Sequence, residues 1–462
     1  MNILLLNPPG DKLYARDKYC TSVSKARYYW PQIDLLMLSG ILGQAHRVEM
    51  LDAIVENLDS DAVRSRIERA RYDAVVFLTS SASWKGDFDL MKAIKKSTGC
   101  LTIANGGFLL FRGSEVMRTH GWLDAVLLDF TADDVLRYLD GKGEIRNMIY
   151  RRDGAIVKGD RSPAGEFFIP VPRHELFPLK KYLFPLQRYP LFTVVNASFG
   201  CPFKCNFCIS AMLPYKLRNV ENVLEELRYI RGLGIREVLF HDSTFTARRN
   251  HSTRLCEAMI GEKLGLHWIC QTRVDCVDEE MLGLMKRSGC HSIEFGVESG
   301  ADSVRKEMSK GIGTGQIERA FSLCHRIGIR TDGFFIIGMP GDTEESINNT
   351  IDLAIRLRCD FAAFSLPMPH PGTKLGEAVK INGWVLSERD LFDDVSLPAS
   401  SYTGLSGKRV WELRNLAYRR FYIRPVYILR RILGLRTWHE LKVHLIVAYS
   451  IFKKIIFGQY AR

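Results

Sequence analysis

Short apolar runs alternate with amphipathic stretches along most of this chain, and that alternation restricts the fold more than any other feature. In residues 1–140 the apolar runs include NILLLN, RVEMLDA, DAVVFLT, LTIANGG and LDAVLLD, with helical patterns such as SDAVRSRIERAR between them. Continuous apolar runs are typical of parallel strands that are buried on both faces by helices. The pattern therefore predicts an α/β chain built on parallel sheets.

Changes in this alternation divide the chain into four regions. Residues 1–140 supply five strands and four or five helices, which predicts a flavodoxin-like or Rossmann-like domain. Residues 141–191 hold a candidate hairpin and then repeated prolines, which predicts a linker laid across a surface. Residues 192–380 contain six further strand-helix repeats, typical of a partial (βα)6 barrel. Residues 381–462 are less regular and end in two helix-like stretches.

The loops after the strands of the first domain are its candidate binding residues. Ligands of open parallel sheets lie outside the carboxyl ends of the strands. No GxGxxG sequence occurs there, so a dinucleotide is not expected. The residues expected to line this crevice and bind a cofactor are Pro8, Thr79, Ser80, Ser81, Gly106 and Gly107.

Three of the eleven cysteines, Cys201, Cys205 and Cys208, crowd into the stretch SFGCPFKCNFCIS, directly after the first candidate strand of the barrel. Three thiolates at this spacing can ligate three irons of a 4Fe-4S cluster and leave the fourth iron open. A structural zinc site usually takes four ligands at paired spacings, and the nearest later candidate, His241, lies on another strand. The stretch therefore favours an iron-sulfur cluster.

CPFKCNFC resembles the CxxxCxΦC motif of the radical S-adenosylmethionine (SAM) superfamily, in which Φ is aromatic. The resemblance implies that SAM chelates the open iron. One-electron reduction, from a donor such as flavodoxin or ferredoxin, would then release a 5′-deoxyadenosyl radical that takes a hydrogen atom from the substrate. It also implies that Phe207 packs beside the adenine.

Four later strand ends, FHDSTFT, TRVD, EFGVESG and GFFIIGMPG, resemble further motifs of the superfamily and follow the cysteines in its order. A buried ion pair or a turn glycine is the alternative explanation of each motif taken alone. The SAM contacts that the resemblance implies are Asp242 for the amino group, Arg273 for the carboxylate, Glu298 and Ser299 for the ribose, and Ile336, Ile337 and Gly338 for the adenine.

The domain order is similar to the subgroup of the superfamily that carries a cobalamin-binding domain, which includes class B methyltransferases and the anaerobic magnesium-protoporphyrin cyclase. NILLLNPP, NGGF and PMPHPGTKL also resemble that subgroup. The chain lacks the DxHxxG motif that gives a histidine to cobalt, so the resemblance implies cobalamin without such a ligand. A surface or packing role is favoured for His46 and His120. Tyr19, Cys20 and Lys25 lie in a long polar loop that could cover the corrin or contact substrate.

Residues 408–462 carry 13 Lys and Arg against Glu412 and Glu440, which is +11 of the net charge of +12. Dense aliphatic and aromatic residues between these bases predict an interfacial helix on an anionic membrane, with a helix pair packed on the barrel as the alternative. No RNA-binding module is evident, so a nucleic-acid partner is not favoured. The odd number of cysteines and the lack of a secretory pattern predict a reducing cytoplasm, with contact at the inner face of the membrane.

These features together predict a radical SAM enzyme, with cobalamin as a further cofactor, that modifies an unactivated carbon of a hydrophobic small molecule such as a lipid or isoprenoid, or of another biosynthetic small molecule. Methyl transfer, cyclisation, oxidation and carbon-carbon bond formation are the candidate outcomes. Two alternatives stay open: a radical SAM enzyme that acts on tRNA or protein, and a non-catalytic sensor that binds a metal or a corrin.

Overall fold

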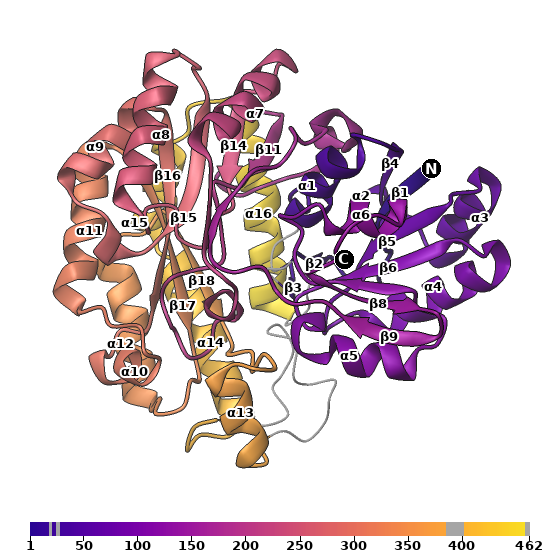
Figure 1. The fold of residues 1–462 in the computed structure, drawn as a ribbon. Helices are drawn as coiled ribbons and strands as arrows, with labels where there is room; N and C mark the ends of the chain where they lie inside the picture. The colour runs from indigo at the N-terminus through magenta and orange to yellow at the C-terminus, as the bar shows by residue number, and fades with distance from the viewer. Residues whose placement is uncertain (18–20, 25–27, 385–401, 458–462) are drawn as a thin grey trace.

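Two parallel sheets, each flanked by helices, form the body of the protein (Figure 1). The computed structural model describes residues 1–17, 21–24, 28–384 and 402–457. Tyr19, Cys20 and Lys25 lie outside the described residues. The α/β class predicted from the sequence is confirmed.

The first sheet contains seven strands in the order β4-β1-β5-β6-β7-β8-β9. Its five parallel strands coincide with the five apolar runs, and their order 2-1-3-4-5 is that of flavodoxin-like folds. A hairpin then extends the sheet with antiparallel strands. The strands are β1 (Asn2–Asn7), β4 (Arg47–Asp52), β5 (Ala74–Leu78), β6 (Leu101–Asn105), β7 (Ala125–Leu127), β8 (Met148–Arg152) and β9 (Ala155–Lys158).

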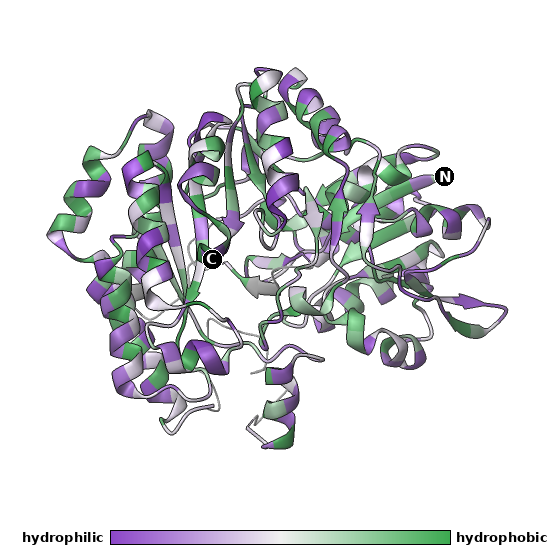
Figure 2. Cartoon of the chain, turned by 60° about the vertical axis from the view of Figure 1, so that its left-hand side comes forward, coloured by the Kyte–Doolittle hydropathy of each residue, from purple (hydrophilic) through white to green (hydrophobic). Residues whose placement is uncertain are grey.

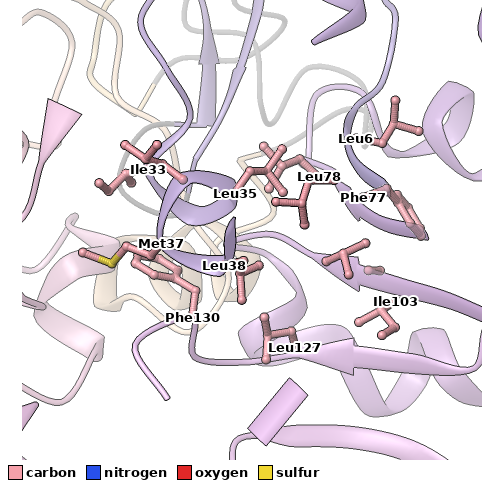
Figure 3. Close-up of a cluster of buried hydrophobic side chains, with 14 of the residues drawn as sticks. Leu6, Ile33, Leu35, Met37, Leu38, Phe77, Leu78, Ile103, Leu127 and Phe130 are labelled. Atoms are coloured by element: carbon pink, nitrogen blue, oxygen red, sulfur yellow. The ribbon is translucent and has the colours of Figure 1, made fainter. Parts of the chain in front are cut away.

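Helices cover this sheet and bury its apolar side chains. Figure 3 shows Leu35 and Leu38 of the first helix beside strand residues such as Leu78 and Leu127. Every residue of that helix is buried, which explains why its sequence, IDLLMLSGIL, is apolar on all sides. The helices are α1 (Ile33–Leu42), α2 (Ala53–Glu56), α3 (Ser60–Ala70), α4 (Trp84–Thr98), α5 (Leu109–Thr119) and α6 (Asp134–Asp140).

The second sheet has six parallel strands in chain order, β11-β14-β15-β16-β17-β18, as the sequence predicts. Its strands are β11 (Phe192–Val195), β14 (Glu237–Phe240), β15 (His267–Thr272), β16 (Cys290–Glu298), β17 (Arg330–Ile336) and β18 (Phe361–Ser365). Its helices are α7 (Val220–Gly232), α8 (Arg249–Gly261), α9 (Glu279–Arg287), α10 (Asp302–Glu307), α11 (Thr314–Ile327) and α12 (Glu344–Arg356). In Figure 2 most strands are largely hydrophobic, while the helices alternate hydrophobic and hydrophilic residues, consistent with one buried face.

The segment 159–191, which follows the hairpin, is held by both halves of the molecule. The Arg173 backbone amide donates to Ser39 Oγ of α1 at 2.9 Å. The next residue, His174, contacts the barrel through both nitrogens of its ring. Its Nδ1 lies 2.7 Å from Thr193 Oγ1, and its Nε2 lies 2.9 Å from Glu226 Oε1. Small sheets complete this region: β2 (Tyr14–Arg16) with β3 (Thr21–Val23), and β10 (Gly165–Phe167) with β13 (Lys216–Arg218) and β12 (Ser198–Phe199).

The C-terminal region packs on the open side of the barrel. The Arg414 guanidinium of its second helix donates to the Phe364 carbonyl of β18 at 2.9 Å. Its last helix lies between the two sheets in Figure 1 and packs Val443 and Val447 against Tyr28 and Leu183. The helices are α13 (Lys374–Ile381), α14 (Gly407–Tyr422), α15 (Pro425–Leu433) and α16 (Trp438–Phe457). Across the described ranges, none of the helices combines the length and apolar character needed to span a membrane.

We predict that Gly40→Ala destabilises the protein, because the added Cβ would lie 2.4 Å from the Pro170 carbonyl oxygen. Such overpacking typically lowers the free energy of unfolding by about 1–3 kcal/mol. Urea unfolding of the purified variant measures the effect.

Gly86→Ala in α4 is the matched control, because no atom lies within 4 Å of its Cβ. Alanine favours a helix over glycine by up to about 1 kcal/mol, so this variant should be as stable as the original or more stable. Equal stability of Gly40→Ala and the unsubstituted protein would contradict the close packing of segment 159–191 on α1.

Candidate active site

The three-cysteine loop lies between β12 and the 3-10 helix Ile209–Met212, at the carboxyl end of the barrel strands. Gly200 opens it with φ +74°, and a Cβ there would lie 2.6 Å from the Pro214 carbonyl oxygen, so only glycine fits. The Asn206 backbone amide donates to the Met308 carbonyl at 3.1 Å and ties the loop to the end of α10. The turn and this tether fix the direction of the loop.

Cys201, Cys205 and Cys208 line one cavity of about 440 Å³. Burial raises the pKa of all three thiols, and the nearby Lys310 ammonium opposes that rise. Among the described residues, no three His, Cys, Asp or Glu side chains stand close enough to hold a single metal ion. The thiolates of a 4Fe-4S cluster lie farther apart than the ligands of a single metal ion, because each thiolate binds a different iron.

Two cations lie beside the cysteines. The Arg273 Nη1 atom is 3.8 Å from Cys205 Sγ, and its guanidinium lies 4.0 Å from the centre of the Phe203 ring. Asp275 holds the other side of that guanidinium at 2.8 Å. The Arg273 guanidinium, which is predicted to bind the SAM carboxylate, is thus bound to the Asp275 carboxylate, and its Nη1 atom faces the Cys205 thiol.

The second cation, Lys310, pairs with Glu298 at 2.7 Å. Glu298 has φ +71°, an uncommon value for a residue other than glycine, and it follows a register shift in β16. Such a bulge re-aims a side chain near a functional site. Here it directs the Glu298 carboxylate to the cavity wall.

The structure separates the predicted SAM contacts into two groups. Phe207, Arg273, Glu298 and Ile336 line the cavity together with the cysteines. The others lie behind its wall and bind neighbouring protein groups: Asp242 accepts from the Ala197 amide at 3.2 Å, Ser299 Oγ lies 3.3 Å from Thr350 Oγ1, the Ile337 amide donates to the Ser365 carbonyl at 2.8 Å, and the Gly338 amide donates to Asp342 at 2.9 Å.

The predicted residues of the first domain lie together at the carboxyl edge of its sheet. Gly106 allows a close approach, since a Cβ there would lie 2.1 Å from the Thr79 carbonyl oxygen. Ser81 Oγ and Asn105 Oδ1 are buried and have no hydrogen-bond partner among the described residues. Buried polar atoms of this kind usually have a partner, so the edge fits a polar ligand.

Sequence reasoning missed Arg16, which fills part of this edge. It donates to the Pro8 carbonyl at 2.8 Å and to Asp87 Oδ1 at 2.8 Å, and it is fully buried. The two histidines of the domain make the packing and surface contacts favoured in the sequence analysis. The centre of the His120 ring lies 5.1 Å from that of Phe88, and His46 Nε2 lies 3.3 Å from Asp140 Oδ1.

A buried contact between the two halves of the molecule was also missed. The carboxylate of Asp17 accepts from Trp30 Nε1 at 2.9 Å and lies 3.1 Å from His241 Nε2 of the barrel. Burial alone would lower the pKa of His241, but Asp17 reverses this and leaves the pKa above its usual value. Trp30 and His241 both line the cavity, so the cavity lies between the first domain and the barrel.

Comparison with known proteins agrees with this geometry. Residues 195–354 match the sequence profile of the radical SAM superfamily. This protein therefore contains a radical SAM domain. The superfamily uses SAM, and its matched region contains all three cysteines of the loop.

Similar proteins cover nearly the whole chain. An uncharacterized methyltransferase of Pyrococcus horikoshii is 27% identical over 94% of this chain and 95% of its own length. The anaerobic magnesium-protoporphyrin IX monomethyl ester cyclase of Rubrivivax gelatinosus is 24% identical over 90% of this chain and 78% of its own. The structure of the radical SAM methyltransferase TsrM from Kitasatospora setae, solved with cobalamin and a 4Fe-4S cluster, has a TM-score of 0.70, 16% identity and 99% coverage of both chains. At that identity the likeness shows a shared fold.

Proposed function

We propose that this radical SAM enzyme is a cobalamin-dependent methyltransferase that acts on an unactivated carbon of a small molecule. The observation that carries the proposal is the cavity between the two sheets, where the three-cysteine loop faces residues of the flavodoxin-like domain. The names of the P. horikoshii relative and of TsrM support methyl transfer. The name of the R. gelatinosus relative makes radical cyclisation the second candidate.

Cys201, Cys205 and Cys208 would hold the 4Fe-4S cluster, since three thiols on one loop leave one iron for SAM. When reduced, the cluster with SAM supplies a 5′-deoxyadenosyl radical. Arg273 and Lys310 place positive charge beside the thiolates and offset their negative charge in a buried site. Phe207 and Ile336 give the same part of the cavity an apolar wall, which excludes water from a reactive intermediate.

The edge of the first sheet would hold the cobalamin, which supplies a methyl group to such reactions. Ser81 Oγ and Asn105 Oδ1, which have no hydrogen-bond partner in the described ranges, offer it hydrogen bonds. Three aromatic residues of the same domain line the cavity on the side opposite the barrel: Tyr28, Tyr29 and Trp30. An electron donor such as flavodoxin or ferredoxin completes the proposed system.

We also propose that the C-terminal helices touch an anionic membrane, which suits a hydrophobic substrate. Val426 and Leu433 of α15 and Trp438 of α16 are 79%, 77% and 86% exposed. Exposed apolar side chains among basic residues are typical of interfacial helices. The inner side of α16 supplies Val447 and Ile451 to the cavity wall, so one helix joins the exposed surface to the site.

Anaerobically reconstituted protein should form 5′-deoxyadenosine from SAM after reduction with dithionite, and Cys205→Ala should abolish it because one iron ligand is lost. Chromatography of the quenched reaction measures the product. Cys276→Ser is the matched control, since this thiol lies near Cys201 but outside the three-cysteine loop. Loss of the product in Cys276→Ser would contradict a cluster held by three cysteines. A fully assembled cluster that binds SAM without cleaving it would favour the sensor alternative.

The protein should retain corrin absorbance after anaerobic incubation with hydroxocobalamin and desalting. Ser81→Tyr should reduce the retained corrin at least fivefold, because the ring would occupy the proposed site. Ser97→Tyr, on the exposed side of α4, is the control and should retain it. No retained corrin in the unsubstituted protein would remove cobalamin from the proposal, and equal retention by Ser81→Tyr would show that this edge is the wrong place.

At low salt the protein should float with vesicles that contain phosphatidylglycerol, and Trp438→Ser with Leu433→Ser should reduce the floated fraction at least threefold. Phe168→Ser is the control, since Phe168 is also an exposed apolar residue (64%) but lies far along the chain from the basic tail. If the protein does not float with anionic vesicles, the proposed membrane contact is wrong, and the C-terminal helices serve to pack on the barrel.

A further inference from the structure

The floor of the cavity carries a row of polar side chains that the proposed chemistry does not use. Residues paired in register on neighbouring parallel strands point to the same face of the sheet. Gln271 of β15 pairs with Glu294 of β16, and Glu294 pairs with Asp332 of β17. His241 directly follows β14, and all four residues line the cavity.

Two carboxyls of this row, Glu294 and Asp332, are buried and incompletely partnered. Glu294 is 4% exposed and Asp332 is 8% exposed. Among the residues that the structure describes, none is a hydrogen-bond partner of Glu294 Oε2 or Asp332 Oδ1. Burial raises the pKa of Glu294 to about 7 and that of Asp332 well above its usual value, and the Glu294 carboxylate adds to the second rise.

The cations that face the pair are bound to other carboxylates. His241 is held by Asp17 of the first domain at 3.1 Å. Arg431 of α15 binds Asp360 at 2.7 Å. Within the described ranges, neither Glu294 nor Asp332 forms an ion pair with Lys, Arg or His. Within the described part of the chain, each of these two cavity-lining carboxyls therefore keeps one acceptor oxygen without a protein donor, which is unusual for buried carboxyls.

The surroundings indicate what would satisfy the pair. Phe334, Phe361, Tyr418 and Tyr422 line the cavity near the same strands and give it an apolar, aromatic wall. A metal ion is disfavoured, because the described residues offer no third donor of the His, Cys, Asp or Glu type here. An organic cation with an apolar body matches both the acceptors and the wall.

We propose that Glu294 and Asp332 form the binding site for a positively charged nitrogen, such as a primary ammonium group, of the substrate. The inference rests on the proposed function, because it names a chemical feature of the small molecule that the cavity accepts. An ammonium group would donate to Glu294 Oε2 and Asp332 Oδ1 and would displace to solvent a proton that the pair holds before the substrate binds. The apolar body of the substrate would then lie along the aromatic wall towards the cysteines.

The experiment compares 2-phenylethylamine with 2-phenylethanol as probes of the anaerobically reconstituted holoprotein at pH 7.5, by isothermal titration calorimetry. The amine should bind at least tenfold more tightly than the alcohol, and titration in two buffers of different ionisation enthalpy should reveal proton release. Equal affinity of the two probes, or amine binding without proton release, would overturn the proposal.

Glu294→Gln and Asp332→Asn keep the shape of each side chain and remove its charge, and each should lower the preference for the amine at least tenfold. Glu257→Gln, an exposed position on α8, is the control and should keep the full preference. An unchanged preference in both cavity variants would overturn the proposal. If a variant fails to fold, the comparison of the amine with the alcohol on the unsubstituted protein still tests the proposal.

Formation of 5′-deoxyadenosine by the unsubstituted protein separates this inference from the proposed function. SAM cleavage without a preference for the amine would overturn the inference alone. A preference for the amine without SAM cleavage would overturn the proposed function alone and leave a binding site for amines.

Discussion

Everything in the site depends on two parallel sheets facing each other through their carboxyl edges. A parallel sheet presents its ligand-binding loops at that edge, so two such sheets can share one ligand only if these edges meet. The buried contact between Asp17 and His241 joins the edges directly. Segment 159–191 adds bonds to α1 on one side and to Thr193 and Glu226 on the other, which fixes their relative position.

The same arrangement explains the number of buried charges near the cavity. Arg16, Arg273 and Lys310 are all nearly inaccessible to solvent, and each is paired with a carboxylate. Removing one member of such a pair leaves a charge buried without compensation, which is far more costly than removing both. The polar groups at the interface therefore depend on one another. Asp17 and His241 form a buried pair of this kind between the first domain and the barrel.

The sequence was sufficient for the strands and for the cysteines because both are local patterns. NILLLN and DAVVFLT are buried parallel strands, and the three cysteines lie in one loop at a strand end. Glu298 was found through EFGVESG, although its pairing with Lys310 was not. Glu294 lies in the same stretch and was missed, yet an acidic residue inside an otherwise apolar strand was a usable indication, as was Asp332 in RTDGFFI. The carboxylate partners of Arg16 and His241 lie 71 and 224 positions away, so no local pattern could reveal them.

Helix α16 has a consequence for how the protein is assembled in the cell. It packs between the two sheets and supplies Val447 and Ile451 to the cavity, yet it follows every strand of the barrel along the chain. Domains generally fold as units during synthesis, beginning with those nearest the N-terminus. The cysteine loop and the cavity floor are thus in place before the helix that encloses one side has been made. At that stage the nascent chain lacks the part of the cavity wall that Val447 and Ile451 form, so this wall is completed after the cysteine loop.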